Sequence, residues 1–306
     1  MSSICGLIIT FYPQEITITN IRKVLSQVDT LIVFDNTPGG AQNLLELKGI
    51  PNVKLVQVGQ NQGVAIALNY GLNFAKANSF EWLATFDQDS QPAPNMITQL
   101  LTAWKAYPLQ SEVLILAPIY KDPKYADSAI ALNVEEKKQK NEVLEKTSVI
   151  TSGNLIQIRG ISDAIQFDED LFIDYVDHDF CLQARKYKRR ILEVPSATML
   201  HSLGDIDYHD LGGYQVHVTN HVPIRHYYLM GNRLYVWLKY FDSFPVWVAK
   251  DIFSTLKMVV RMALFERDRY ERFKYLLLGI RGFMSGEKGI CPKKYLIDSR
   301  FLNDSL

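Results

Sequence analysis

The chain has 306 residues, of which 47% are hydrophobic and 22% are charged, and this balance is typical of a globular protein rather than a disordered or fibrous one. Its formal net charge is zero, so the sequence does not indicate a nucleic-acid partner. The three cysteines, Cys5, Cys181 and Cys291, are too few and too far apart for a disulfide framework or a zinc site. The segment from Met1 to Ile4 has no basic region like that of a secretory signal, and we therefore expect a cytoplasmic protein.

Charge is divided unevenly along the chain. Residues 1–220 contain 18 Lys and Arg and 25 Asp and Glu, whereas residues 221–306 contain 15 Lys and Arg and 8 Asp and Glu. A basic C-terminal region beside an acidic body indicates an anionic partner for that region.

The first part of the chain alternates between strand and helix patterns. Apolar runs predict strands over Ser3–Thr10, Thr30–Phe34, Val53–Val58 and Trp82–Phe86, and helical spacing predicts helices over Ile16–Gln27 and Gly63–Ala77. Such alternation predicts a mostly parallel sheet, and ligands of parallel sheets bind at the carboxyl ends of the strands. The polar residues at those ends are Thr10, Asp35, Asn36, Asn61, Asp87 and Asp89.

The middle of the chain continues this pattern less regularly. We expect a helix over Met96–Tyr107, strands over Val113–Pro118, Ser148–Arg159 and Ile191–His201, helical spacing over Leu171–Tyr187, and a loop over Leu203–Val222. These elements complete an α/β domain that we place at residues 1–222.

Residues 223–306 form a C-terminal region of amphipathic helices, predicted over Tyr227–Tyr240, Pro245–Phe265 and Tyr270–Phe283. The charged residues within Pro245–Phe265 argue against a membrane-spanning helix, which needs about 20 nearly uncharged residues. Two interpretations remain open. The helices pack on the α/β domain, or a basic face lies on an anionic membrane surface, at the inner face of the cell membrane.

Asp87 and Asp89 follow the strand predicted over Trp82–Phe86. Residues two apart on an extended chain point the same way, so both carboxylates can face one ligand, and two such oxygen donors suit a divalent cation that also holds phosphate. A solvated turn would explain the same residues without function. An EF-hand loop does not fit, because the required Gly and closing Glu are missing. A phosphatase of the haloacid dehalogenase type also uses Asp-x-Asp, but after its first strand rather than the fourth.

A second acidic cluster lies at Asp174, Asp177 and Asp179, among apolar residues. Carboxylates in such a setting are costly unless paired or functional, and crowding raises the pKa of a carboxylate toward the range of a general base. Helix N-terminal Asp residues offer a structural explanation for Asp174 or Asp179. His201 ends a predicted strand and is either a metal ligand or a structural hydrogen-bonding residue.

Nine short segments form a recognisable series along the chain. They are Ile8–Pro13, Val33–Asn36, Asn61–Ala65, Phe86–Ser90, Thr151–Asn154, Phe172–Leu182, His201–Asp205, Arg225–Tyr228 and Gly231–Arg233. In this order they resemble the family 2 glycosyltransferases, and among them the bacterial rhamnosyltransferases. The resemblance extends over most of the chain, from residue 3 to residue 286.

The resemblance implies a GT-A fold and an inverting transfer of a sugar from a nucleotide-sugar donor. It implies a nucleotide pocket lined by Thr10, Tyr12, Asp35, Asn36, Asn61, Gly63 and Asp87. It implies a divalent cation, Mg²⁺ or Mn²⁺, bound by Asp89, Asp87 and His201. Asp177 matches the position of the family's catalytic base. The acceptor side would include Ser152 and Gly153, with Asp174 and Asp179 as further candidates.

The donor and acceptor follow from the same resemblance. A rhamnosyltransferase would use dTDP-L-rhamnose and act on a glycan or a polyprenyl-diphosphate-linked acceptor in cell-surface polysaccharide synthesis; the alternatives are a UDP-hexose donor and a non-catalytic sugar-nucleotide-binding protein. The chain departs from the family pattern at three positions. Related members often have Asn at the position of Tyr12, Glu at that of Asp179 and Arg at that of Gln183.

Overall fold

The computed structural model describes residues 2–121, 142–200, 206–211, 214–219 and 222–296. The chain forms two compact units, one from Met1–Glu169 with Val176–Ser202 and the other from Asp170–Tyr175 with Leu203–Leu306. The short segment Asp170–Tyr175 therefore belongs with the C-terminal helices, although it lies inside the first unit in sequence.

The first unit is built on one mixed sheet, and among the described residues its strands run in the order β3-β2-β1-β4-β8-β6-β9-β5, with β7 paired to β9. The pairings β3–β2, β2–β1, β1–β4 and β6–β9 are parallel, whereas β5, β7 and β8 are antiparallel to their neighbours. The prediction of a mostly parallel sheet in an α/β fold is confirmed. The strands are β1 (Ile4–Thr10), β2 (Thr30–Asp35), β3 (Val53–Gln57), β4 (Trp82–Asp87), β5 (Gln91–Pro92), β6 (Val113–Lys121), β7 (Leu144–Glu145), β8 (Leu155–Gln157) and β9 (Arg190–Leu200).

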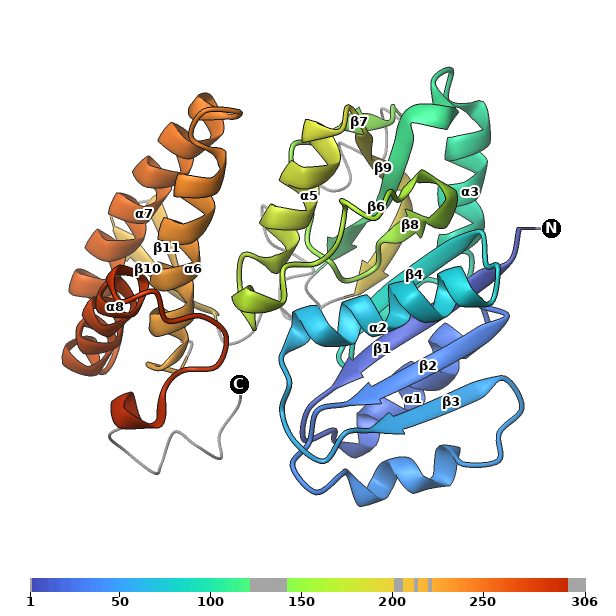
Figure 1. Ribbon diagram of the computed structural model, residues 1–306, viewed down its shortest axis with the longest axis horizontal. Helices are drawn as coiled ribbons and strands as arrows, with labels where there is room; N and C mark the ends of the chain where they lie inside the picture. The colour runs from blue at the N-terminus through green and yellow to red at the C-terminus, as the bar shows by residue number, and fades with distance from the viewer. Residues whose placement is uncertain (1, 122–141, 201–205, 212–213, 220–221, 297–306) are drawn as a thin grey trace. The chain divides into compact units, whose positions relative to one another are not determined.

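Helices cover both faces of this sheet (Figure 1). One buried cluster joins side chains of α1 (Glu15–Leu25) and α3 (Met96–Ala106) to alternate residues of the strands, such as Ile8 and Phe86. The opposite face, which carries Leu7, packs against α2 (Val64–Ala77). Because strand side chains alternate between faces, these nearly continuous apolar strands are buried on both sides. Short 3₁₀ turns lie at Gln42–Leu47, Gln110–Glu112, Ile158–Gly160, Glu169–Leu171 and Lys293–Tyr295.

Two expectations for the middle of the chain are only partly right. Within Ser148–Arg159, only β8 is a strand, because the preceding segment turns at Gly153 with φ of 81°. The helix expected over Leu171–Tyr187 begins at Val176 and ends at Lys186 as α5. Three residues just before it, Phe172, Asp174 and Tyr175, have positive φ, which no α-helix accepts.

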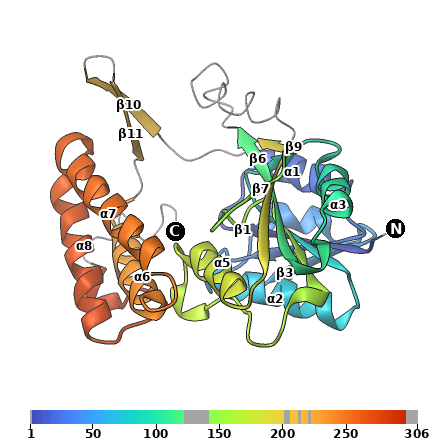
Figure 2. The same cartoon turned by 90° about the horizontal axis from the view of Figure 1, so that it is seen from above.

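The second unit contains α6 (Arg225–Tyr240), α7 (Pro245–Phe265) and α8 (Arg269–Met284), which lie side by side (Figure 2). Pro245 occupies the first turn of α7, where its missing N–H costs no helical hydrogen bond. Helices α6 and α8 approach closely at Gly279, where an added Cβ would lie 2.4 Å from the Tyr227 carbonyl oxygen. The buried side chains between the helices include Met230, Met262 and Leu276.

The loop expected over Leu203–Val222 is wrong for the described part of that segment. Strands β10 (Ile206–Leu211) and β11 (Tyr214–Thr219) pair antiparallel, with Leu211 opposite Tyr214. The sequence held a signal for this hairpin, because polar and apolar residues alternate on both sides of a Gly-Gly pair.

Candidate active site

The candidate site of the first unit begins at the carboxyl ends of three neighbouring parallel strands, β2, β1 and β4 (Figure 1). Thr10 pairs with Asp35 across β1 and β2, and Ile9 pairs with Asp87 across β1 and β4. The structure therefore brings Thr10, Asp35 and Asp87 to one edge of the sheet, where ligands of such sheets bind.

The Asp35 carboxylate is fully buried and organises the loop that follows β2. Its Oδ1 accepts hydrogen bonds from the Thr10 hydroxyl at 3.2 Å and the Thr37 amide at 3.0 Å. Its Oδ2 accepts from the Ala41 amide at 2.7 Å and from the Gln57 side chain at 3.1 Å. Four donors compensate the burial of this charge, so Asp35 fixes the shape of the strand end.

Asn36 connects the end of β2 to the start of α2. Its amide Nδ2 donates to the Gly63 carbonyl at 3.0 Å, and its Oδ1 accepts from the Gln62 amide at 3.1 Å. The Asn61 side chain accepts from the Gly63 amide at 2.9 Å, and Gly63 has φ of 85° immediately before the helix. These bonds hold the loop before the N-terminus of α2 at the same strand ends.

Tyr12 lies at the mouth of this edge, after the end of β1. Its side chain is 45% exposed, its φ is 46°, and its amide donates to the Thr37 hydroxyl at 2.9 Å. The Phe11 and Tyr12 rings contact each other edge to face, with centroids 4.6 Å apart. An exposed aromatic ring held in this way offers a flat surface to a ligand.

The Asp-x-Asp turn, formed by Asp87, Gln88 and Asp89, is tied to the end of β1. The Phe11 amide donates to Gln88 Oε1 at 2.9 Å, and Gln88 Nε2 donates back to the Phe11 carbonyl at 3.1 Å. The Asn20 side chain of α1 donates to the Gln88 carbonyl at 3.0 Å. Gln88 is not among the site residues predicted from the sequence, although its position between two Asp residues is a signal that could have identified it.

The segment Thr151–Asn154 supports the other side of this turn. The Asp87 amide donates to Ser152 Oγ at 3.0 Å, and Ser152 Oγ lies 2.6 Å from Ser90 Oγ. Ser152 is buried, and an added Cβ on Gly153 would meet Pro118 Cγ at 2.7 Å. Ser152 and Gly153 thus contact the backbone that carries the carboxylates, and an acceptor role for them remains a prediction.

The donor set at this turn fits a divalent cation. Asp87 and Asp89 are both partly exposed at the strand end, and carboxylate oxygens are the ligands that Mg²⁺ and Mn²⁺ prefer. Leu200, the residue before His201, pairs with Gln91, two residues after Asp89. His201 itself lies outside the described residues. Within the described part of the chain, no three His, Cys, Asp or Glu side chains are grouped as a metal site.

Asp177 and Asp179 lie in the first turn of α5, where the helix dipole favours negative charge. Asp177 is partly exposed, and its Oδ1 accepts from the His178 amide at 2.8 Å. Burial, then the charges of Glu193 and Asp177, raise the pKa of the Tyr120 phenol. Tyr120 is the penultimate residue of β6, and β6 runs in the same direction as β4. Tyr120, and Asp177 beside it, therefore lie near the edge of the sheet that carries Asp87.

Asp179 is buried completely and is bonded within its own unit. The Gln183 side chain donates to Asp179 Oδ2 at 2.5 Å and also to the Gln166 carbonyl at 2.8 Å. This environment makes Asp179 a structural partner of Gln183. A direct acceptor contact by Asp179 remains a prediction.

Asp174 belongs to the second unit, where it forms a bidentate ion pair with Arg225 of α6. Arg225 Nη2 lies 2.8 Å from Asp174 Oδ1, and Arg225 Nε lies 3.0 Å from Oδ2. Asn232 donates to the carbonyls of Leu171, Ile173 and Asp174 at 2.6, 2.8 and 3.0 Å. Residues of α6 therefore hold the segment of positive φ that precedes Asp177 in the chain by two residues.

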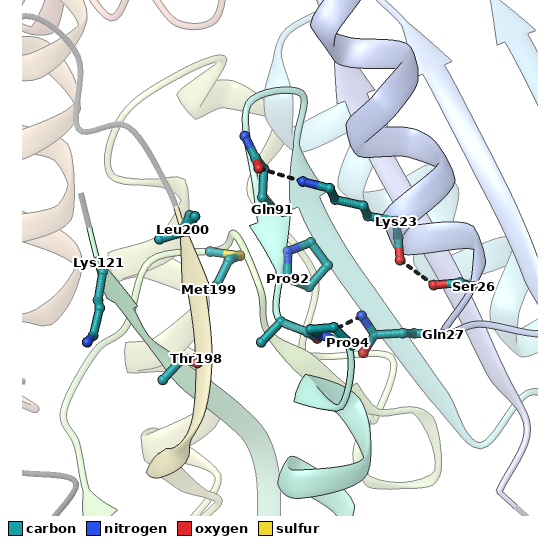
Figure 3. A pocket seen from close by; sticks show the side chains of 11 residues that line it. Lys23, Ser26, Gln27, Gln91, Pro92, Pro94, Lys121, Thr198, Met199 and Leu200 are labelled. Atoms are coloured by element: carbon teal, nitrogen blue, oxygen red, sulfur yellow. Dashed lines mark hydrogen bonds between the residues drawn. The ribbon is translucent and has the colours of Figure 1, made fainter. Parts of the chain in front are cut away.

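A separate hollow of about 370 Å³ lies between α1, β5 and the end of β9 (Figure 3). Lys23 of α1 donates to Gln91 Oε1 at 2.7 Å on one side, and Lys121 of β6 borders the other side. Among the described residues, Pro92 and Met199 line the hollow, and no carboxylate does. None of the predicted site residues within the described part of the chain borders it.

The family comparison supports the arrangement at the strand ends. Residues 7–165 match the family model described as "Glycosyl transferase family 2", which is more than half of the chain. The chain belongs to the family 2 glycosyltransferases. The matched residues include the second half of β1, all of β2 and β4, and the Asp-x-Asp turn. The family membership makes the protein a sugar-transferring enzyme.

This family 2 glycosyltransferase is 26% identical over 297 residues to "dTDP-rhamnosyl transferase RfbF" of Shigella flexneri, covering 93% of this chain and 98% of that protein. The fold resembles a crystal structure of GalNAc-T7 with UDP, GalNAc and Mn²⁺, with a TM-score of 0.51 and 12% sequence identity. The superposed region covers 69% of this chain and 44% of that chain. It also resembles S. aureus TarS 1–349 in complex with UDP, with a TM-score of 0.50 and 14% sequence identity. Here the superposed region covers 92% of this chain and 72% of that chain. The predicted GT-A fold is confirmed.

Proposed function

We propose that this enzyme transfers L-rhamnose from dTDP-L-rhamnose, with inversion at C1, to a glycan or polyprenyl-diphosphate-linked acceptor in cell-surface polysaccharide synthesis. The observation that carries the chemistry is the Asp-x-Asp turn, which Gln88 ties to the end of β1 and which Ser152, just before β8, supports by accepting a hydrogen bond from the Asp87 amide. The similarity to a dTDP-rhamnosyl transferase over nearly the whole length of both chains supports the choice of donor.

The strand ends supply the nucleotide pocket in this proposal. Tyr12 offers an exposed ring, and Asn36 with Asn61 and Gly63 shapes the loop before α2. Asp35 acts through the loop that it holds, because its four hydrogen-bond donors are already protein groups. The partly exposed Asp87 would face the ribose and diphosphate end of the donor.

Asp87 and Asp89, joined by His201, would hold Mg²⁺ or Mn²⁺. Such a cation supplies positive charge against the diphosphate as it leaves. Asp177 accepts the proton of the acceptor hydroxyl while that oxygen forms a bond to C1 on the face opposite the diphosphate. The C1–oxygen bond to the diphosphate breaks, and both electrons leave with it. A β-linked donor therefore gives an α-linked product.

Four residues are assigned to the acceptor side. Ser152 and Gly153 border the turn that carries Asp87, and Asp179 stabilises the start of α5 beside Asp177. Asp174 would act through the segment that Arg225 holds. All four serve the acceptor side by shaping the site in this proposal.

A UDP-hexose donor is the second candidate. Two GT-A structures that this fold resembles are described with UDP, namely those of GalNAc-T7 and TarS, and the first also with GalNAc and Mn²⁺. Tyr12, which stands where relatives often carry Asn, is the residue of this chain at which the nucleotide pocket departs from the family pattern.

A donor panel tests the proposal. The purified chain is incubated with dTDP-L-rhamnose, UDP-glucose and UDP-galactose, and release of the nucleoside diphosphate is measured with Mn²⁺ or with chelator. Turnover of dTDP-L-rhamnose above the UDP-sugars is expected, and the reverse order overturns the donor. Calorimetry with dTDP tests the cation. Equal dTDP affinity with Mn²⁺ and with chelator, or equal Mn²⁺-dependent affinity in wild type and Asp89→Ala, overturns the metal role.

A further inference from the structure

Helix α7 of the second unit has one buried face and one exposed apolar face. Val248, Thr255 and Met262 are buried at the helical spacing of seven residues, and Met262 packs with Met230 of α6 and Leu276 of α8. On the other side, an exposed apolar stripe is formed by side chains spaced three or four residues apart. This α7 stripe consists of Val246, Ala249, Phe253, Leu256, Val260 and Leu264.

The exposure of the α7 stripe is large for a protein surface. Phe253 is 59% exposed and Leu256 is 58% exposed, and both lie at the middle of the helix. The stripe runs from Val246 to Leu264, and these 18 steps along the helix correspond to about 27 Å at 1.5 Å per residue. A continuous apolar band of this length marks a contact surface, whereas single exposed apolar residues do not.

Charge on α7 is separated by face. Lys250, Lys257 and Arg261 are exposed along one border of the α7 stripe. The acidic residue of the helix, Asp251, lies on the other side, where its Oδ2 accepts from Trp237 Nε1 at 2.7 Å and lies 3.2 Å from Arg233 Nε. The exposed side of α7 therefore combines an apolar surface with positive charge.

The cations adjoin the apolar side chains. The Lys257 ammonium lies 4.5 Å from the centre of the Phe253 ring. Long basic side chains beside exposed apolar groups are typical of a helix that lies in a membrane interface, with the ring among acyl chains and the ammonium among phosphates. No helix within the described residues is both long and apolar enough to cross a bilayer.

We propose that the α7 stripe docks the protein onto an anionic lipid surface, with α7 lying parallel to the membrane plane. The positive charge along the border of the α7 stripe favours an anionic bilayer over a second copy of the chain. In a symmetric pairing of two copies through this face, each chain would bring the same three cations, and like charges oppose such a contact. An anionic bilayer satisfies both the apolar stripe and its basic border. This inference is independent of the proposed donor, because binding to lipid is measured without sugar transfer.

Vesicle co-sedimentation of the full chain tests the inference. The vesicles contain phosphatidylcholine alone or phosphatidylcholine mixed with phosphatidylglycerol. We expect the wild type to prefer the anionic vesicles, and added salt to weaken that preference. Equal binding to both compositions, or binding to neither, would overturn the inference.

Paired variants separate the two parts of the surface. Phe253→Ser with Leu256→Ser should lower vesicle affinity at least about tenfold, because two exposed side chains lose their apolar contribution. Lys250→Glu with Lys257→Glu should remove the preference for anionic lipid. Matched controls in the first unit, Leu109→Ser and Lys105→Glu, change exposed residues of the same types and should bind like the wild type.

Two further measurements check that the variants are folded and that the stripe does not bind a second copy of the chain. Circular dichroism and thermal unfolding establish that each variant is folded, and the charge variants alone suffice if the apolar pair does not fold. Sedimentation velocity without lipid tests whether the α7 stripe instead binds a second copy of the chain. A wild-type dimer that becomes monomeric in the Phe253→Ser, Leu256→Ser variant would assign the stripe to a second copy and overturn the membrane proposal.

Discussion

Gln88 pairs with both backbone groups of Phe11. Its Oε1 accepts from the Phe11 amide at 2.9 Å and its Nε2 donates to the Phe11 carbonyl at 3.1 Å, in the manner of a neighbouring strand. These two bonds join the end of β1 to the Asp-x-Asp turn and leave the flanking carboxylates, Asp87 and Asp89, on the partly exposed side. The middle residue of the motif therefore positions the outer two.

Gln88→Ala should damage catalysis more than folding. Loss of two partly buried hydrogen bonds costs about 1–3 kcal/mol of the free energy of unfolding. A carboxylate pair displaced by about 1 Å can lower kcat/KM by about 10². Urea unfolding and steady-state kinetics measure the two effects. Gln91→Ala is the matched control, since its side chain bonds Lys23 at the exposed surface, and equal kcat/KM in both variants would contradict the role of Gln88.

Asp177→Asn should separate proton transfer from donor binding. The amide keeps an oxygen that accepts from the His178 N–H, so α5 should begin as in the wild type. It cannot accept the acceptor proton, and removal of a general base lowers kcat by about 10²–10⁴. Isothermal titration with dTDP should show unchanged affinity. Asp163→Asn, at a fully exposed position that pairs with Lys76, is the control, and wild-type turnover by Asp177→Asn would exclude this residue as the base.

Gly153→Ala should destabilise the first unit. The new Cβ would lie 2.7 Å from Pro118 Cγ and 3.0 Å from Met199 Sδ, and φ of 81° is strained for any residue with a Cβ. Strain and overpacking together cost about 2–5 kcal/mol. Gly39→Ala is a matched comparison, because φ there is 77° and no atom beyond the two adjacent residues lies within 4 Å of the added Cβ. Urea unfolding should show the smaller loss for Gly39→Ala, and equal losses would argue against the contacts at Gly153.

Asn232→Ala should release the segment that precedes α5 in the chain. Three carbonyls between Leu171 and Asp174 share the Asn232 amide, and loss of these bonds costs about 1–3 kcal/mol. Because Asp177 follows this segment by two residues, we expect kcat to fall while dTDP affinity is retained. Asn78→Ala removes a bond from an exposed side chain to the Phe74 carbonyl and serves as the control. A fall in dTDP affinity equal to the fall in kcat would contradict a positioning role.

The thiols should be unreactive in the folded protein. Burial raises the pKa of Cys5, Cys181 and Cys291 to about 12 each. At pH 8, four pH units below that value, only about one thiol in 10⁴ is the reactive thiolate. Titration with a disulfide reagent should therefore label all three cysteines only after guanidinium unfolding. A thiol that reacts at the rate of free cysteine in native buffer would show that its burial is not maintained.

Much of the first unit follows from sequence because its signals are local. The run from Trp82 to Phe86 predicts a strand, the alternation of strands with helices predicts a parallel sheet, and the residues that follow each strand predict the ligand edge. Thr10, Asp35 and Asp87 could be placed together from chain order alone, since parallel strands present their carboxyl ends at one edge. The motif order was also sufficient to predict the family.

Other features depend on contacts between residues distant in sequence, and only the tertiary structure decided them. Gln88 meets Phe11 across 77 positions, and Asn232 reaches Leu171 across 61. Local apolar spacing favoured a helix that begins at Leu171, but α5 begins at Val176 because residues before it have positive φ angles. Those φ angles depend on such distant contacts. Likewise, the sequence pattern left open whether the C-terminal helices pack on the protein or lie on a membrane surface. Burial of Met262 against Met230 of α6 and Leu276 of α8 decided which face of α7 remained exposed, since a periodic pattern does not specify its partner.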